Sequence, residues 1–217
     1  MRALQYHRKP ALSGKTSSLV VFLHGYGADG ADLFGLADTL APHLPGTVFV
    51  APDAPEPAKG GYGLQWFPIP WLDGSSELAA AQGLAQATGD LNGFLDARLV
   101  AEGLDDSGLI LLGFSQGAMI AMHVAPRRAR AMAGVVAISG RLLEPENIGQ
   151  ITAKPPVLLI HGDRDDVVPF GNMAHAGEVL DSAGIETFGH VMRGTGHGIA
   201  PDGLSVALSF SRDRLPQ

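Results

Sequence analysis

The chain has 217 residues, of which 46% are hydrophobic and 17% are charged, so we expect an ordered protein with a sizeable core rather than a disordered chain. The net charge of −7 and the lack of basic runs argue against nucleic-acid binding, because phosphate contacts need a basic face. There is no cysteine, which excludes disulfides, thiolate metal sites and a cysteine nucleophile.

Long apolar segments of the kind that membranes and secretion require are missing. No run of 18 apolar residues occurs, and the N-terminal segment lacks the apolar stretch of a signal peptide. The length fits one domain over residues 1–217. We therefore expect a soluble, cytoplasmic protein without integral membrane contact.

Short apolar runs rich in Val, Ile and Leu alternate with helical stretches. In chain order, the predicted elements are strands at Leu19–Leu23 and Thr47–Ala51, a helix at Ser76–Val100, a strand at Leu109–Leu112, a helix at Gln116–Ala125, strands at Gly134–Ile138 and Val157–Ile160, a helix at Phe170–Ala183, a strand at Glu186–Met192 and a helix at Pro201–Phe210. Strands without polar alternation are covered on both faces. This order predicts an α/β fold with a mostly parallel sheet and helices on both of its faces.

The segment Ala54–Ser75 fits neither pattern. It is rich in Gly and Pro, yet it contains Tyr62, Trp66, Phe67 and Trp71. A loop of this length is uncommon inside a compact domain and is often functional. Two interpretations stay open, in which the aromatic side chains either line a binding site or fill the core beneath a surface loop.

The strongest chemical signal is the sequence G-x-S-x-G at Gly113–Gly117, directly after one predicted strand and directly before a predicted helix. In this context the glycines permit a sharp turn that exposes the Ser115 hydroxyl above the sheet, near the positive end of the helix. This predicts a nucleophilic serine. The alternative is a glycine-rich turn whose serine only caps the helix.

A serine hydroxyl needs a base to take its proton. In folds with this motif the acid and then the histidine follow the serine along the chain. This order leaves five candidate histidines, which are His123, His161, His175, His190 and His197. We predict His197 as the base, because it lies in the glycine-rich segment Gly194–Gly198 between the last strand and the last helix, where a flexible loop can bring an imidazole over Ser115.

The acid is expected after the strand that ends at Ile160, where three carboxylates compete. These are Asp163, Asp165 and Asp166, and the residue pattern alone does not choose between Asp165 and Asp166. The adjacent His161 also invites a metal site, but no second histidine at ligand spacing supports one.

Two backbone N–H groups are predicted to stabilise an oxyanion. One belongs to Gln116, the residue after the nucleophile, and the other to Tyr26, in the loop after the first predicted strand.

The same loop, Gly25–Gly30, also reads G-x-G-x-x-G, with Asp53 at the end of the next strand, which is formally a dinucleotide fingerprint. Asp29 would place negative charge where a pyrophosphate must bind, and the strand end at Pro52 is irregular for a ribose-binding acid. We therefore expect neither a cofactor nor a metal.

Four segments together resemble the phospholipase/carboxylesterase family of α/β-hydrolases, which includes acyl-protein thioesterases and small bacterial carboxylesterases. They are Leu23–Gly30, Gly113–Met119, His161–Pro169 and Gly196–Gly198, in the order of the family. The likeness extends over nearly the whole chain and implies the α/β-hydrolase fold.

The resemblance also implies roles for individual residues. The family's acid falls four residues after the histidine of His-Gly, which matches Asp165 and implies a Ser115–Asp165–His197 triad. Tyr26, with its backbone N–H as oxyanion donor, stands where leucine is frequent. The segment Gln65–Pro68 looks like the loop that lines the acyl site in bacterial members and differs from the eukaryotic thioesterases. We therefore predict that three aromatic side chains bind the substrate, namely Trp66, Phe67 and Tyr62.

We predict a serine carboxylesterase that hydrolyses short- to medium-chain esters through an acyl-enzyme intermediate. The 16-residue segment Arg141–Pro156 lies between two predicted strands where related enzymes often carry a lid and is too short for one, so no lid domain is expected. A lysophospholipase or acyl-(protein) thioesterase is the alternative, and a non-catalytic binding module is a remote one. The expected partner is a small-molecule ester or thioester, and a homodimer stays possible.

Overall fold

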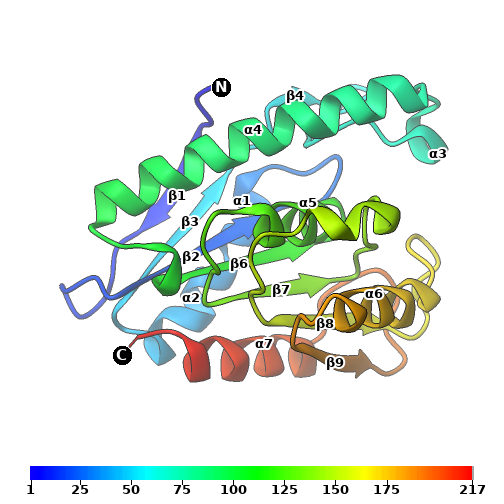
Figure 1. Cartoon of the computed structure of the whole chain (residues 1–217). Coiled ribbons are helices and arrows are strands. Elements are labelled where there is room, and N and C mark those ends of the chain that lie inside the picture. The colour runs from blue at the N-terminus through cyan, green and yellow to red at the C-terminus, as the bar shows by residue number, and fades with distance from the viewer. Residues whose placement is uncertain (217) are drawn as a thin grey trace.

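The computed structural model describes residues 1–216 and is built around a seven-stranded sheet of order β1-β3-β2-β6-β7-β8-β9 (Figure 1). All neighbouring strands in it run parallel, except that β1 pairs antiparallel with β3. The strands are β1 (Tyr6–Lys9), β2 (Ser18–Leu23), β3 (Thr47–Pro52), β6 (Leu109–Phe114), β7 (Gly134–Ile138), β8 (Val157–Gly162) and β9 (Thr187–Met192).

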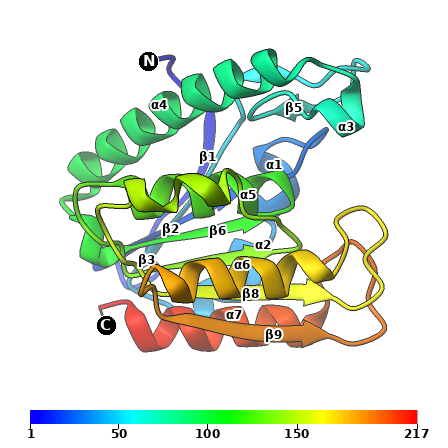
Figure 2. The same ribbon diagram turned by 45° about the vertical axis from the view of Figure 1, so that its right-hand side comes forward.

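Helices cover both faces of this sheet (Figures 1 and 2). One face carries α4 (Glu77–Glu102), α5 (Gln116–Val124) and α6 (Gly171–Ser182), and the other carries α1 (Gly30–Phe34), α2 (Leu36–Leu40) and α7 (Pro201–Arg214). Along β2, Leu19 and Val21 point into the first apolar layer, whereas Val20 and Phe22 point into the second. The predicted mostly parallel sheet, covered on both faces, is confirmed.

Several predicted helix ends are set by capping. The Ser76 hydroxyl accepts a hydrogen bond from Ala79 N–H at 3.1 Å where α4 begins. Gly184, with φ +74°, follows the end of α6, and Pro201 is the first residue of α7. Ser76 and Pro201 therefore mark where α4 and α7 begin, and Gly184 marks where α6 ends.

Some elements were not predicted. The strand β1 has a polar sequence at the edge of the sheet, and α1 and α2 have five residues each, too few for a helical apolar pattern. The segment 54–75 contains β4 (Glu56–Pro57), β5 (Leu64–Gln65) and α3 (Pro70–Asp73). Short 3-10 turns lie at Ala41–His43, Asp106–Gly108, Ala125–Arg127 and Pro145–Gln150, and the last of these is the only regular element between β7 and β8 in the described residues.

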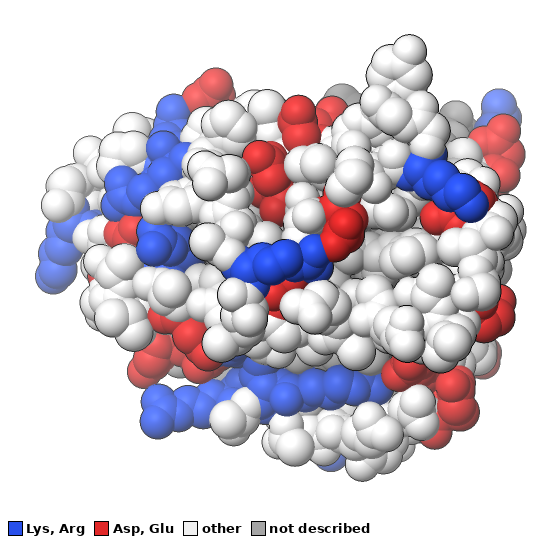
Figure 3. Space-filling model, turned by 90° about the horizontal axis from the view of Figure 1, so that it is seen from above, with Lys and Arg blue, Asp and Glu red and all other residues white. Residues whose placement is uncertain are grey.

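Cationic and anionic side chains lie next to one another on the face that carries α4 (Figure 3). Among the described residues, Arg128 pairs with Asp96 at 2.7 Å and with Asp106 at 2.6 Å. None of the helices within residues 1–216 is long and apolar enough to cross a membrane.

His123 is a buried histidine near the C-terminal end of α5, eight residues after Ser115. Its Nδ1 has no hydrogen-bond partner in residues 1–216, and burial, together with the Arg127 cation, lowers its pKa from 6.5 to about 4. Between these values the unfolded chain binds a proton that the folded protein does not. The free energy of unfolding therefore falls as the pH falls through this window, by at most about 1.4 kcal/mol per pH unit.

We expect His123→Leu to flatten this pH dependence, because leucine takes up no proton in either state. Urea unfolding near neutral pH and at about pH 5 would measure the free energies. His43→Gln removes an exposed histidine and should leave the slope unchanged. A slope in His123→Leu equal to that of the unmodified protein would contradict the prediction.

Candidate active site

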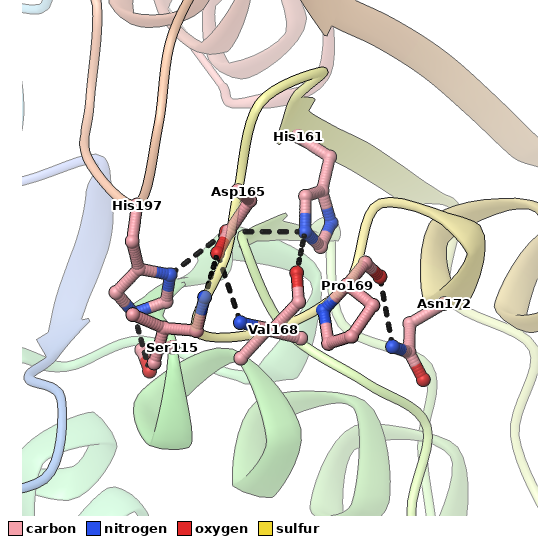
Figure 4. Close-up of polar contacts among 8 residues, drawn as sticks. Ser115, His161, Asp165, Val168, Pro169, Asn172 and His197 are labelled. Atoms are coloured by element: carbon pink, nitrogen blue, oxygen red, sulfur yellow. Dashed lines mark hydrogen bonds and ion pairs between the residues drawn. The ribbon is translucent and has the colours of Figure 1, made fainter.

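Three predicted side chains meet at the carboxyl edge of the sheet (Figure 4). Ser115 follows β6, Asp165 follows β8, and His197 lies between β9 and α7. His197 Nε2 is 3.0 Å from Ser115 Oγ, and His197 Nδ1 is 2.8 Å from Asp165 Oδ2. Because a carboxylate can only accept, Nδ1 carries the proton and Nε2 is free to accept the serine hydroxyl proton. This is the arrangement of a nucleophile, a base and a group that orients the base.

Ser115 occupies a strained turn, with φ +53° and ψ −116°. A Cβ atom on Gly113 would lie 2.3 Å from the carbonyl oxygen of Gly117, and one on Gly117 would lie 1.8 Å from that of Leu23. Only glycine at both positions lets α5 begin this close to β2 and β6. The Ser115 side chain makes no capping hydrogen bond to α5, so the alternative of a simple helix cap is not supported.

Asp165 and Asp166 are adjacent in sequence but differ in burial and hydrogen bonding. The Asp165 carboxylate is buried, with Oδ1 accepting from Val167 N–H at 3.0 Å and from Val168 N–H at 2.8 Å. Burial alone would raise its pKa, but the hydrogen bonds from His197 and these two N–H groups outweigh burial and hold the pKa below its ordinary value. Asp165 is therefore anionic at neutral pH, whereas Asp166 is exposed, and the hydrogen bond of His197 Nδ1 goes to Asp165.

The two predicted oxyanion donors lie beside the nucleophile. Neither the Tyr26 N–H nor the Gln116 N–H donates to a side chain or a loop carbonyl within residues 1–216. The loop before Tyr26 passes so near that a Cβ on Gly25 would lie 3.3 Å from Ser115 Cβ. Both N–H groups are therefore available to a ligand at Ser115.

Two buried polar side chains that sequence reasoning missed hold these donors in place. Gln116 Oε1 accepts from Trp66 N–H at 2.9 Å, and its Nε2 donates to Phe67 O at 2.6 Å. His24 Nε2 accepts from Ala54 N–H at 3.0 Å, so its Nδ1 carries the proton, which it donates to Gly25 O at 2.8 Å. Burial lowers the pKa of His24, which keeps the ring neutral. For His24, the available signal was a polar side chain directly after a fully buried strand.

A cavity of about 370 Å³ opens beside Ser115, and its lining is mainly apolar. Besides Ser115 and His197, it is lined by Tyr26, Ile69, Trp71, Leu72, Met119, Asp166, Val167 and Val168.

The structure does not bring the predicted substrate-binding residues Trp66, Phe67 and Tyr62 to this cavity. Trp66 is fully buried, and its indole N–H donates to His24 O at 3.0 Å, which draws the ring inward. Phe67 lines a neighbouring cavity, and Tyr62 is 86% exposed. The same segment contributes Trp71 and Leu72 instead, so its aromatic residues divide between core and site.

In the segment that matches the dinucleotide fingerprint, the backbone N–H groups bind carboxylates of this chain. Asp53 Oδ1 accepts from Gly30 N–H at 2.9 Å, and Asp29 Oδ1 accepts from Ala31 N–H at 2.9 Å. These carboxylates use the N–H groups at which a pyrophosphate would bind in a dinucleotide site. Gly30 is needed for close packing, because a Cβ there would lie 2.6 Å from Ala51 O.

The chain belongs to the phospholipase/carboxylesterase family, whose model matches residues 11–213. It is 42% identical to esterase PE8, and the two structures agree with a TM-score of 0.93 over 99% of this chain and 100% of that one. It is 31% identical to acyl-protein thioesterase 1 of Saccharomyces cerevisiae over 210 residues, covering 90% of this chain and 92% of the relative. Esterase YpfH of Escherichia coli is 24% identical, with 92% and 84% covered.

These comparisons confirm the predicted family and the α/β-hydrolase fold. Within residues 1–216, the segment between β7 and β8 contains only the short 3-10 turn Pro145–Gln150. A carboxylesterase from Bacillus cereus, at 18% identity and a TM-score of 0.79, shares the fold as well. Relatives that are esterases and thioesterases support an ester-hydrolysing enzyme.

Proposed function

We propose that the protein is a serine carboxylesterase that hydrolyses short- to medium-chain esters through an acyl-enzyme intermediate. The observation that supports this most strongly is the hydrogen-bonded chain from Ser115 through His197 to Asp165, with contacts of 3.0 and 2.8 Å, beside an apolar cavity. The 42% identity to an esterase that covers nearly all of both chains agrees with it.

In the proposed mechanism, His197 Nε2 takes the hydroxyl proton as Ser115 Oγ attacks the ester carbonyl carbon. The N–H groups of Tyr26 and Gln116 stabilise the resulting oxyanion. Protonated His197, oriented by Asp165, gives its proton to the leaving alcohol as the carbon–oxygen bond breaks. A water molecule then attacks the acyl-enzyme with the same base, releasing the acid and restoring Ser115.

The cavity bears on the substrate class. Its apolar wall suits an acyl chain, and each buried CH₂ contributes about 0.8 kcal/mol, or about fourfold in kcat/KM. Asp166 contributes a carboxylate to the lining, which disfavours substrates with negative charge near the ester. Neutral esters therefore fit the cavity best.

Thioesters are the second candidate substrates, since the yeast relative is named an acyl-protein thioesterase. The same groups can cleave a thioester, with a thiol as the leaving group. The ratio of kcat/KM for an ester and a thioester of the same acyl chain would decide between the two.

A fluorophosphonate probe and a series of p-nitrophenyl esters from acetate to palmitate test the proposal. We expect covalent labelling at Ser115 and a maximum of kcat/KM at short to medium chains. A maximum at long chains would point instead to lysophospholipids or long acyl-thioesters. Absence of both labelling and hydrolysis would contradict the proposal and favour a binding module.

Trp71 lines both the cavity beside Ser115 and a second cavity of about 170 Å³. The Arg141 guanidinium stacks on its ring, 4.5 Å from the centroid. We expect Trp71→Ala to join the two cavities and to move the chain-length optimum upward, by about fourfold in relative kcat/KM for each additional buried CH₂. The ester series measures this.

Tyr62→Ala is the matched control. The Tyr62 ring is exposed and belongs to the same segment as Trp71, but it lines neither cavity. Its chain-length profile should equal that of the unmodified protein. If the chain-length profile of Trp71→Ala also equals that of the unmodified protein, the Trp71 side chain does not limit the length of the bound acyl chain.

A further inference from the structure

A second histidine contacts the carboxylate of Asp165. His161 lies near the end of β8 and is 1% exposed. Its Nε2 is 2.9 Å from Val168 O and 3.2 Å from Asp165 Oδ2 (Figure 4). Because a carbonyl oxygen can only accept, Nε2 carries a proton and donates it to Val168 O, with Asp165 Oδ2 close beside this N–H group. The proposed mechanism gives this residue no role.

Asp165 Oδ2 accepts a hydrogen bond from His197 Nδ1 at 2.8 Å, and His161 Nε2 lies 3.2 Å from the same oxygen, in a close polar contact. Since Oδ1 accepts from the N–H groups of Val167 and Val168, the carboxylate has three hydrogen-bond donors and the close contact with His161 around it. Hydrogen bonds from several directions fix the rotation of a carboxylate and stabilise its charge.

His161 and His197 lie in structural elements of different rigidity. Asp165 and His197 both lie in loops, whereas His161 belongs to a strand paired on both sides, with β7 and β9. The loop before His197 also packs against this strand end, since a Cβ on Gly162 would lie 2.3 Å from Thr195 O. His161 is thus the rigid point from which the carboxylate can be oriented.

We propose that His161 is a positioning residue for the hydrolytic reaction. Its Nε2–H binds Val168 O, and the N–H of Val168 in turn binds Asp165 Oδ1. Together with the 3.2 Å contact to Oδ2, this holds the Asp165 carboxylate where it receives the Nδ1–H of His197. His161 contacts neither Ser115 nor the cavity, so it transfers no proton and binds no substrate. The inference rests on the proposed function.

Replacement of His161 by leucine removes the N–H donor, and replacement by glutamine keeps an N–H group at similar reach. We expect His161→Leu to lower kcat by about 10- to 100-fold with KM nearly unchanged, and His161→Gln to recover most of the loss. A kcat within about twofold of the unmodified protein, or a loss that resides in KM, would overturn the proposal.

A double-mutant cycle separates positioning from a general loss of loop structure. If His161 acts through Asp165, His161→Leu should cause little further loss in an Asp165→Asn background. If the fold-losses of kcat in His161→Leu and Asp165→Asn multiply in the double variant, His161 acts independently of Asp165, and the proposal is overturned.

Two measurements keep the test independent of folding and of the proposed function. Imidazole ¹⁵N shifts of the unmodified protein should show His161 protonated at Nε2, and an unprotonated Nε2 would overturn the inference even if the leucine variant did not fold. Ser115→Ala tests the proposed function separately. If Ser115→Ala loses activity while the His161 variants behave like the unmodified protein, only the positioning role fails.

Discussion

Replacing Ser115 with alanine is expected to lower kcat for ester hydrolysis by about 10⁶-fold, because the attacking oxygen is lost and only the oxyanion donors and the cavity remain. His197→Ala should lose about as much, since the serine then has no base. The double variant should be no worse than either single one, because the groups act as a unit. Steady-state kinetics on a p-nitrophenyl ester of medium chain length measures all three.

Ser139→Ala provides a matched control for the first prediction. Ser139 follows β7 as Ser115 follows β6, is buried and has a nearly equal φ of +52°, but its hydroxyl has no hydrogen-bond partner within residues 1–216. This variant should keep its activity and its labelling by a fluorophosphonate. Activity of Ser115→Ala within tenfold of the unmodified protein would refute the assignment of the nucleophile.

The second large effect is expected at Asp165. Asparagine there keeps the shape but removes the negative charge that orients His197 and stabilises its protonated form, so Asp165→Asn should lower kcat by about 10⁴-fold. Asp166→Asn makes the same chemical change one residue away, at an exposed position, while the hydrogen bond of His197 Nδ1 goes to Asp165. Its effect on kcat should be small by comparison.

Kinetics of both variants with one ester, together with their unfolding temperatures, would measure this difference. A larger loss of kcat in Asp166→Asn than in Asp165→Asn would reverse the assignment of the acid. Equal losses would mean that neither carboxylate orients the base alone.

Much of the fold could be predicted from the sequence because its signals are local. Continuous Val, Ile and Leu runs indicate strands covered on both faces, and residues such as Ser76 and Pro201 mark helix starts through their own backbone chemistry. Ser115 could be chosen for the same reason, since the two glycines around it act on the turn in which they lie. His197 followed from chain order and from the glycines of its own loop.

Elements without such signals could not be predicted. The strand β1 is polar because it lies at the edge of the sheet, and its pairing with β3 depends on backbone groups far away in the sequence. His161 showed only as a histidine beside carboxylates, which invited a metal site. Its contact with Asp165 depends on how the loop after β8 folds back.

The sequence by itself determined the order of strands and helices, the serine on its sharp turn and the family resemblance, because each depends on residues near one another in the chain. The residue pattern left two adjacent aspartates open and only the resemblance implied Asp165. The tertiary structure shows that Asp165 meets His197, because that depends on the approach of the loop between β9 and α7. It also decided that Trp66 fills the core and Trp71 lines the cavity. Both are tryptophans of one segment, and only the partners that packing brings to each ring distinguish them.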